Sequence, residues 1–167
     1  KERVRSAITN SFLEFPKKRI TINLAPAELP KDGAHYDLPI GLAILCSSGQ
    51  LKQKEMDHAI FAGELALDGS VRPIKGVINI AETAKKHGYE RIYIPSSNAE
   101  QASLIDGITI IPVTSIKELF LHLKGEVVIP AYTPTAREQR DDEYLSPVID
   151  DVYGQEQAKR ALIIAAA

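Results

Sequence analysis

Three consecutive basic residues, Lys17, Lys18 and Arg19, are the side chains in this sequence best suited to bind phosphate. Ammonium and guanidinium groups in a row can neutralise neighbouring phosphates of a nucleic-acid backbone. A solvated entrance to a strand would carry the same charges, so both interpretations stay open. The chain has 20 basic and 22 acidic residues and a net charge of −2. Because that balance gives no general attraction to polyanions, any DNA contact has to be local.

The residues that could act as nucleophiles or metal ligands form no recognisable constellation. Ser47 and Ser48 have no histidine near them in sequence, and the acidic pairs at 141–142 and 150–151 lie in linker-like sequence. Neither GxxxxGKS/T nor GxGxxG occurs, so no phosphate-binding loop is predicted. No metal site is predicted either, because the histidines fall in separate predicted elements. These histidines are His35, His58, His87 and His122.

The one cysteine, Cys46, lies in the most apolar stretch of the chain, residues 38–46. A lone cysteine cannot form an intramolecular disulfide, so we expect a small buried hydrophobe and a reducing, cytoplasmic setting. The stretch itself predicts a helix that is apolar on every side and therefore internal. Asp37 is expected to cap its N-terminus, and Pro39 suits its first turn.

Two elements are predicted before this central helix. Apolar residues spaced three and four apart predict an amphipathic helix over residues 1–15, which Pro16 ends. Residues 17–24 then alternate, with Ile20, Ile22 and Leu24 on one face, and this alternation predicts a half-buried strand.

After the central helix, the pair Asp68-Gly69 between two apolar runs predicts a hairpin with a positive φ at both residues. Ser115 and Glu118 predict a capping box at the start of a late helix. The other predicted elements are a helix over 77–87, strands over 91–95 and 108–113, and helices over 98–104 and 116–123. Strands alternating with helices, together with an antiparallel hairpin, predict an α+β fold with a mixed sheet.

The character of the sequence changes at residue 125, where prolines and a charged cluster predict a linker that extends to 147. An Ala- and Ile-rich helix is predicted after it, over 150–167, and we expect its packing partner to lie in a longer parent protein. Since no apolar run approaches about 20 residues, no membrane partner is predicted.

Three sequence blocks together resemble a known family. NLAPAELPKDG…YDLPIGLAIL and GELALDGSVRPIKG resemble the N-terminal domain of magnesium-chelatase-like AAA+ proteins of the bacterial competence ComM type. VYGQEQAKRALIIAAA resembles the start of their ATPase module. The resemblance implies a Lon protease-like domain with the ribosomal protein S5 domain 2-like fold over 1–124. A linker over 125–147 would follow, and then the start of an AAA+ module over 148–167.

The same resemblance implies that the parent binds ATP and Mg²⁺ and associates with itself into a hexameric ring. In AAA+ modules the segment resembling the start of the third block lies against adenine. This implies base contacts by Ile149, Val152, Tyr153 and Gly154 in the parent. No cofactor is expected for this chain alone, because the phosphate loop would come after residue 167.

Lon proteases, whose protease domain is also similar, place a serine at the start of the buried helix and a lysine on the helix after the hairpin. The resemblance puts Asp37 at the serine position and Ile80 at the lysine position. A carboxylate and a branched aliphatic cannot perform the hydroxyl and amine chemistry. We therefore expect no catalytic residues and no working Ser-Lys peptidase.

The resulting expectation is a non-catalytic scaffold and DNA-contact domain of a hexameric ATPase. The parent would act in DNA recombination or natural transformation as a branch-migration helicase. The alternative is a magnesium-chelatase-like or chaperone-like AAA+ subunit that remodels a protein partner.

Overall fold

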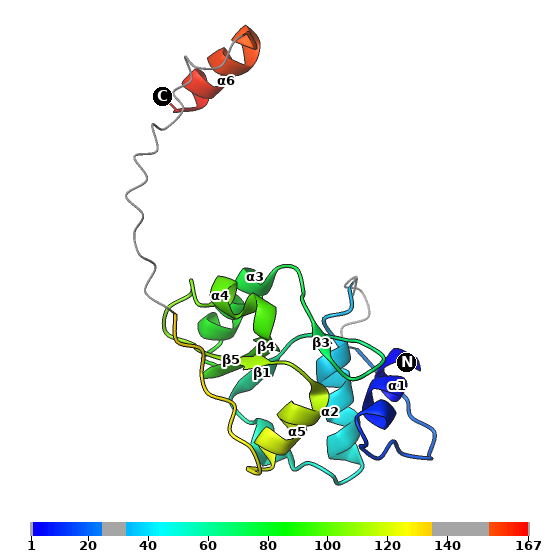
Figure 1. Cartoon of the computed structure of the whole chain (residues 1–167). Helices are drawn as coiled ribbons and strands as arrows, with labels where there is room; N and C mark the ends of the chain where they lie inside the picture. The colour runs from blue at the N-terminus through cyan, green and yellow to red at the C-terminus, as the bar shows by residue number, and fades with distance from the viewer. Residues whose placement is uncertain (1, 25–32, 135–153, 167) are drawn as a thin grey trace. The chain divides into compact units, whose positions relative to one another are not determined.

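The computed structural model describes residues 2–24, 33–134 and 154–166. Its internal contacts divide the chain into two units, Lys1–Pro134 and Thr135–Ala167, and each is described by itself. Figure 1 shows the first unit as a sheet with helices on both sides. This arrangement confirms the predicted mixed α/β fold. The predicted mixed sheet is wrong, because the parallel strands and the antiparallel hairpin form two separate sheets among the described residues.

A parallel three-stranded sheet forms the centre of the first unit. Its strands are β1 (Ala59–Phe61), β4 (Arg91–Pro95) and β5 (Thr109–Val113), in the order β1-β4-β5. Ile92 of the middle strand lies opposite Ile60 and Ile110. Four of the five residues of β4 are buried, as expected for a strand covered on both faces.

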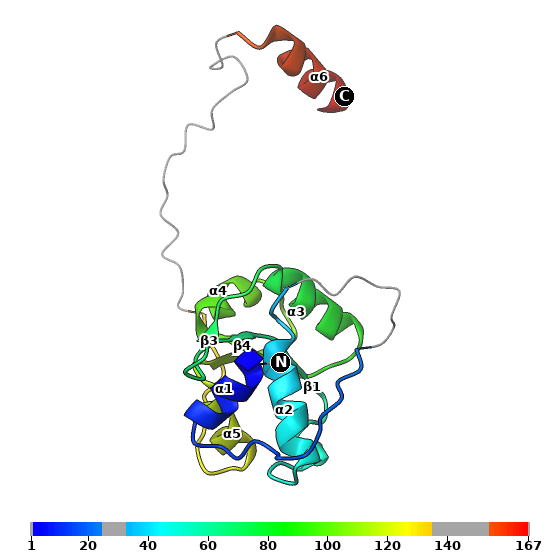
Figure 2. The same cartoon turned by 90° about the vertical axis from the view of Figure 1, so that its right-hand side faces the viewer.

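Two hydrophobic clusters fill the space on either side of this sheet. Ile92 and Ile94 belong to one cluster, with α3 (Val77–Lys86) and α4 (Ala99–Ala102). Tyr93 between them belongs to the other cluster, with α1 (Glu2–Asn10), α2 (Asp37–Ser47) and α5 (Ile116–Leu123). The alternation along β4 therefore assigns each helix layer to one sheet face, as Figures 1 and 2 show.

The first helix ends earlier than its apolar periodicity predicts. α1 stops at Asn10, and Phe12 has a positive φ of 61° and is 89% exposed. Leu13 N–H donates to the Ile8 carbonyl and Phe12 N–H to the Thr9 carbonyl, both at 3.1 Å. This pair of bonds is the Schellman closure of a helix, so the expected helix over 1–15 is wrong in its last third.

The strand predicted over 17–24 is not formed. Within the described residues, no backbone hydrogen bond involves this segment, and no strand pairs with it. The prediction failed because side-chain alternation indicates an extended backbone but does not supply a neighbouring strand.

The central helix α2 is buried as predicted, with Leu38, Leu42 and Leu45 at most 1% exposed. It is not covered all round, because Ala43 is exposed. A β-carbon at Gly41 would lie 2.8 Å from Ile116 Cδ1, so glycine permits the close approach of α2 and α5. The expectation that Asp37 caps the helix is wrong: the N-cap is Tyr36, without a side-chain bond, and Asp37 is the first helical residue.

The predicted hairpin is confirmed, although its turn differs. β2 (Glu64–Leu65) pairs antiparallel with β3 (Val71–Arg72). Gly69 has a φ of 88°, whereas Asp68 does not have a positive φ. The Asp68 carboxylate instead accepts hydrogen bonds from Ser70 N–H at 2.9 Å and Ser70 Oγ at 2.7 Å. The turn is therefore a three-residue type with glycine at its left-handed position.

The late helix α5 begins as expected, but its capping box is only half formed. The Ser115 side chain accepts from Glu118 N–H at 3.2 Å. The Glu118 carboxylate accepts from Thr114, through N–H at 3.1 Å and through the hydroxyl. Short 3₁₀ turns, η1 (Gln53–Met56) and η2 (Ser96–Asn98), complete the elements before residue 134.

Two residues of the predicted linker, Ile129 and Tyr132, attach it to the first unit, while most of residues 125–134 are exposed. Ile129 is 6% exposed, and Tyr132 N–H donates to the Ile110 carbonyl of β5 at 2.7 Å. In the second unit, α6 (Glu156–Ala166) forms within the predicted terminal helix. No helix among the described residues is long and apolar enough to cross a membrane.

Candidate functional site

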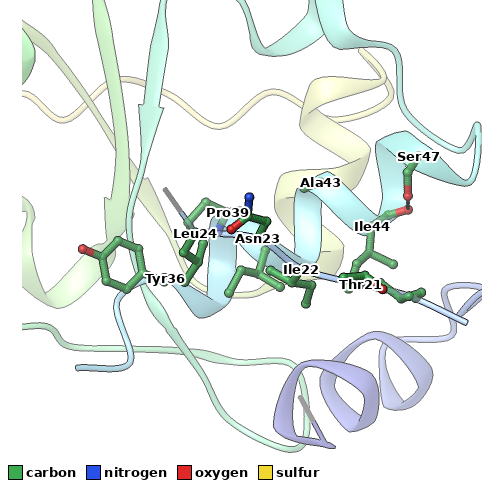
Figure 3. Close-up of a pocket in the computed structure, with 11 residues that line it drawn as sticks. Thr21, Ile22, Asn23, Leu24, Tyr36, Pro39, Ala43, Ile44 and Ser47 are labelled. Atoms are coloured by element: carbon green, nitrogen blue, oxygen red, sulfur yellow. Dashed lines mark hydrogen bonds between the residues drawn. The ribbon is translucent and has the colours of Figure 1, made fainter. Parts of the chain in front are cut away.

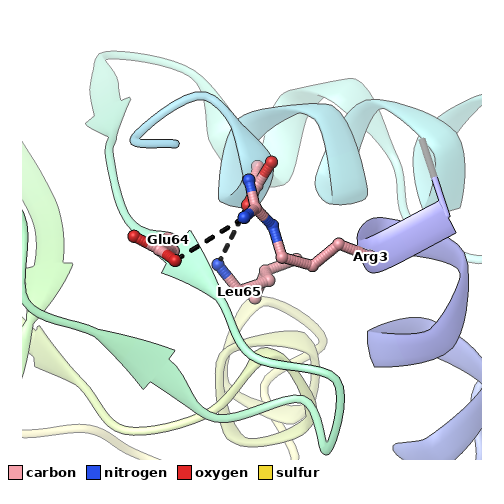
Figure 4. A network of polar contacts seen from close by, with 4 residues as sticks. Arg3, Glu64 and Leu65 are labelled. Carbon is pink, nitrogen blue, oxygen red and sulfur yellow. Dashed lines mark hydrogen bonds and ion pairs between the residues drawn. The ribbon is translucent and has the colours of Figure 1, made fainter. Parts of the chain in front are cut away.

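The start of α2 holds a network of charged groups from three elements. Arg3 of α1 places its Nε 2.6 Å from Asp37 Oδ2 and its Nη1 3.6 Å from Glu64 Oε1. The Leu65 N–H of β2 donates a hydrogen bond to the same Asp37 oxygen, with an N···O distance of 3.4 Å (Figure 4). These contacts tie α1, α2 and the hairpin together at the position where a Lon serine is expected.

Asp37 has the environment of a structural anion. Its side chain is 13% exposed, and the Arg3 side chain is 43% exposed. The hydrogen bond to Asp37 raises the pKa of the Arg3 guanidinium against the smaller opposing effect of desolvation. An ionised carboxylate accepts hydrogen bonds but has no proton to give up, and the N-terminal end of α2 favours its charge. The arrangement holds the helix in place, and its four described residues carry neither a hydroxyl nor an amine side chain.

Ile80 lies on α3, half-buried against the hydrophobic cluster that contains Ile92 and Ile94. It lines a pocket of about 350 Å³, and none of the described residues in that lining is a lysine. The lining is formed by His35, Tyr36, Ile60, Phe61, Ala62, Asn79, Ile80, Thr83, Ala84, His87 and Tyr89. A methyl-bearing side chain therefore fills the place that the resemblance assigns to the amine. Assigning Asp37 and Ile80 to the two Lon positions stays a prediction.

Lys75 is the amine that comes nearest in sequence to this region. It is exposed in the turn before α3 and lines a separate pocket of about 490 Å³ with His35 and Glu64. The described lining of that pocket contains no serine, threonine, cysteine or tyrosine. No hydroxyl shares this pocket with the amine among the residues that the structure describes, so no Ser-Lys pair is formed there.

The basic triplet lies in a different place, at the C-terminal end of α2. Lys17, Lys18 and Arg19 are exposed and line a pocket of about 660 Å³. The rest of the lining is mostly polar or small: Glu14, Pro16, Ile20, Thr21, Ser47, Ser48 and Gln50. The carbonyl end of a helix also favours cations, so the site combines a possible anion contact with local stabilisation of the helix.

The polar neighbours of the triplet were not predicted from the sequence. Ser47 Oγ donates to the Ile44 carbonyl at 2.9 Å, and Ser48 Oγ donates to the Leu45 carbonyl at 3.0 Å. Gln50 Nε2 donates to the Glu14 carbonyl at 2.7 Å, which fixes the loop after α1 against the end of α2. The Glu14 carboxylate, also in the lining, is the one acidic group among the described residues of this pocket.

A buried aromatic contact between β4 and β1 was also not predicted from the sequence. Tyr93 stacks on Phe61 with ring centroids 4.7 Å apart, and its hydroxyl lies 3.3 Å from His122 Nε2. His122 Nδ1 in turn accepts from Ile129 N–H at 3.0 Å. Burial raises the pKa of the Tyr93 phenol, with a smaller opposing effect from Arg91. Only the assembled fold brings these residues together, so no local signal could have revealed them.

The residues expected to contact a nucleotide base are mostly outside the described parts of the chain. Ile149, Val152 and Tyr153 lie outside the described residues, and Gly154 precedes α6 with a φ of 74°. Within the described residues, no group of three or more histidine, cysteine or acidic side chains could hold a metal ion.

Comparison with known proteins identifies relatives over the full sequence. Residues 1–98 match the family described as ChlI, subunit ChlI of Mg-chelatase. Protein YifB of Escherichia coli is 42% identical over 167 residues, covering 100% of this chain and 32% of YifB. Competence protein ComM of Haemophilus influenzae is 40% identical over 168 residues, covering 99% of this chain and 33% of ComM. An archaeal Lon protease of Methanocaldococcus jannaschii is 33% identical over 122 residues, covering 69% of this chain and 18% of the protease. The chain thus spans about one third of the length of YifB and ComM.

Proposed function

Because the chain belongs to the family of subunit ChlI of Mg-chelatase, we propose that it is the non-catalytic scaffold and DNA-contact domain of a hexameric AAA+ ATPase acting in DNA recombination or natural transformation. The resemblance to the competence ComM type is confirmed by the match to ComM over nearly the whole chain. The match to a Lon protease agrees with the expected Lon-like fold. The parent's substrate and its cytoplasmic location are parts of the proposal.

The observation that carries the scaffold role is the ion pair at the start of α2. Asp37 lies 2.6 Å from Arg3 and is almost buried, so the residue proposed at the nucleophile position is used to join α1 to α2. Ile80 packs against the cluster of Ile92 and Ile94 instead of presenting an amine. Both groups contribute to packing and neither supplies acid–base chemistry.

The proposed DNA contact is the pocket that Lys17, Lys18 and Arg19 line at the other end of α2. Three exposed cations on one loop can follow successive phosphates, and no described salt bridge occupies them. The overall charge of −2 makes such a contact local and strongly dependent on salt.

The proposed domain plan places the Lon-like domain over 1–124, a linker over 125–147 and the start of the AAA+ module over 148–167. In the parent, ATP and Mg²⁺ would be bound by this module, with Ile149, Val152, Tyr153 and Gly154 against the base. Ring formation brings the scaffold domains of several subunits together, so weak DNA contacts from each would add up.

A magnesium-chelatase-like or chaperone-like subunit that remodels a protein partner is the second candidate. The description of the matching family favours it. An assay of the full-length parent for ATP-driven branch migration of DNA and for protein unfolding distinguishes the two. Branch migration supports the first candidate, and protein unfolding without it supports the second.

The DNA contact is tested by fluorescence anisotropy with a labelled oligonucleotide at several salt concentrations. Changing Lys17, Lys18 and Arg19 to Gln should weaken binding and lower the slope of log K against log salt by about one for each phosphate that is no longer neutralised. The matched control changes three exposed lysines elsewhere, Lys75, Lys85 and Lys86, to Gln and should have little effect. Equal weakening in both variants would show a general charge effect and contradict the assigned site.

The absence of peptidase chemistry is tested with casein and a fluorogenic peptide. We expect no turnover, because the described pocket lined by Lys75 contains no hydroxyl side chain. Turnover that Lys75→Ala or Ser47→Ala abolishes would overturn the scaffold assignment.

A further inference from the structure

Residues 20–24 run along the outer side of α2 and form one wall of an apolar pocket of about 420 Å³ (Figure 3). The opposite wall comes from α2 and the residue before it: Tyr36, Pro39, Ile40, Ala43, Ile44 and Ser47. No charged side chain belongs to the described lining. An apolar surface without charge is unsuited to phosphate or a metal ion and suits another apolar chain segment.

The backbone of this segment is unpaired among the described residues. No backbone hydrogen bond there involves residues 20–24, although their alternation of apolar and polar side chains is typical of a half-buried strand. Ile22 is 40% exposed and Leu24 is 39% exposed. An extended segment with free N–H and C=O groups and exposed β-branched or aliphatic side chains has the properties of an open sheet edge.

The side of α2 that faces residues 20–24 also exposes apolar surface. α2 carries no charged residue after Asp37, yet Ala43 is exposed and Pro39 only half-buried. A helix that is apolar on all sides is normally covered on all sides. Both walls of the pocket therefore expose apolar surface to the same missing neighbour.

We propose that residues 20–24 are the edge at which a second extended segment of the same polypeptide, outside these 167 residues, adds as a β-strand. This inference rests on the longer parent of the proposed function, because the chain spans only 32% of YifB and 33% of ComM. A strand of about five residues, roughly 16 Å long, would match the edge. Its side chains alternate, with apolar residues over Pro39 and Ala43 and polar residues outward.

A covalently attached segment is favoured over a second copy of the chain as the occupant. Tethering by a short flexible linker gives a segment an effective concentration in the millimolar range, whereas binding of a second copy depends on protein concentration. Main-chain hydrogen bonds supply the affinity in strand addition, and the alternate side chains supply the specificity.

Hydrogen exchange at the amides of residues 20–24 tests the proposal directly. In this chain alone these amides should exchange at rates close to those of an unstructured peptide. In the full-length parent the alternate amides that face the added strand should exchange at least roughly 100-fold more slowly, while the amide of buried Leu42 is protected in both. Unprotected amides in the parent would overturn the proposal. Protection in the isolated chain that rises with protein concentration would assign the edge to a second copy and overturn it too.

A pair of variants provides an independent measurement. Ile22→Asp should lower the melting temperature of the parent more than that of the isolated chain, because the contact of Ile22 with the added strand exists only in the parent. Val128→Asp, at a residue 81% exposed, is the matched control and should be neutral in both. An equal effect of Ile22→Asp in both proteins would contradict the added strand. If the full-length parent protects the amides of residues 20–24 but does not bind DNA, only the proposed DNA contact is contradicted.

Discussion

Removing the Arg3 guanidinium should destabilise the domain by leaving Asp37 without its cation. Arg3→Met keeps much of the apolar stem but removes both ion pairs, at 2.6 Å and 3.6 Å. Loss of one partner costs about 3–5 kcal/mol for a fully buried pair and about 0–1 kcal/mol for an exposed one. With Asp37 13% exposed and Arg3 43% exposed, we expect an intermediate cost of about 2 kcal/mol.

A double-mutant cycle isolates the pair itself. Asp37→Asn removes the charge and keeps the shape, so the double variant should show a coupling energy of about 1 kcal/mol that decreases in high salt. Urea unfolding followed by far-UV circular dichroism measures it, and the single Arg3 variant should melt roughly 6 °C lower. Arg5→Met is the control on the same helix, because the Arg5 guanidinium lies over the Phe15 ring, 5.6 Å from its centroid, and not on Asp37.

A coupling energy below about 0.3 kcal/mol would refute the reasoning, since pairs that do not interact add within that error. It would mean that the Asp37 carboxylate is not held by Arg3 and is available for another role. The claim that packing has replaced chemistry at the start of α2 would then lose its main support.

Two further results are expected. Phe12→Gly should stabilise the domain by about 0.5–1 kcal/mol in urea unfolding, because φ is 61° at the position where a Schellman closure favours glycine, whereas Phe12→Ala should give no gain. For Tyr93, burial raises the folded-state pKa above the unfolded value of about 10, so stability is fully present below about pH 10 and falls as the pH rises past it. Tyr93→Phe should remove that alkaline loss in unfolding measured from about pH 9 to 11, and an unchanged loss would show that another group causes it.

The features predicted correctly from sequence depend on residues close to one another in the chain. The hairpin at Asp68-Gly69 and the cap at Ser115 each involve a few neighbouring residues, so local chemistry was sufficient. Asp37 was wrongly expected to cap α2, because its partner Arg3 is distant in sequence and no local pattern indicates it. The strand over 17–24 failed for the same reason, since pairing requires a neighbour.

The candidate site shows the same division. The cations Lys17, Lys18 and Arg19 could be named from sequence, whereas the pocket they share with Ser47 and Gln50 is created by the fold.

Phe12 fits the helical periodicity and still lies outside α1, because a backbone closure after Asn10 ended the helix before the pattern did. Periodicity describes which face is apolar, and it does not locate the hydrogen bonds that stop a helix.

The strap formed by residues 125–134 has a mechanical consequence. Tyr132 bonds to Ile110 of β5, and Ile129 is buried beside His122, so the chain leaves the domain only after these attachments. Tension applied beyond residue 134 would first break the contacts of Tyr132 and Ile129 before it acts on the hydrogen bonds between β4 and β5. If a motor were joined to this end, its pull would detach residues 125–134 first, and β4 and β5 would stay paired until then.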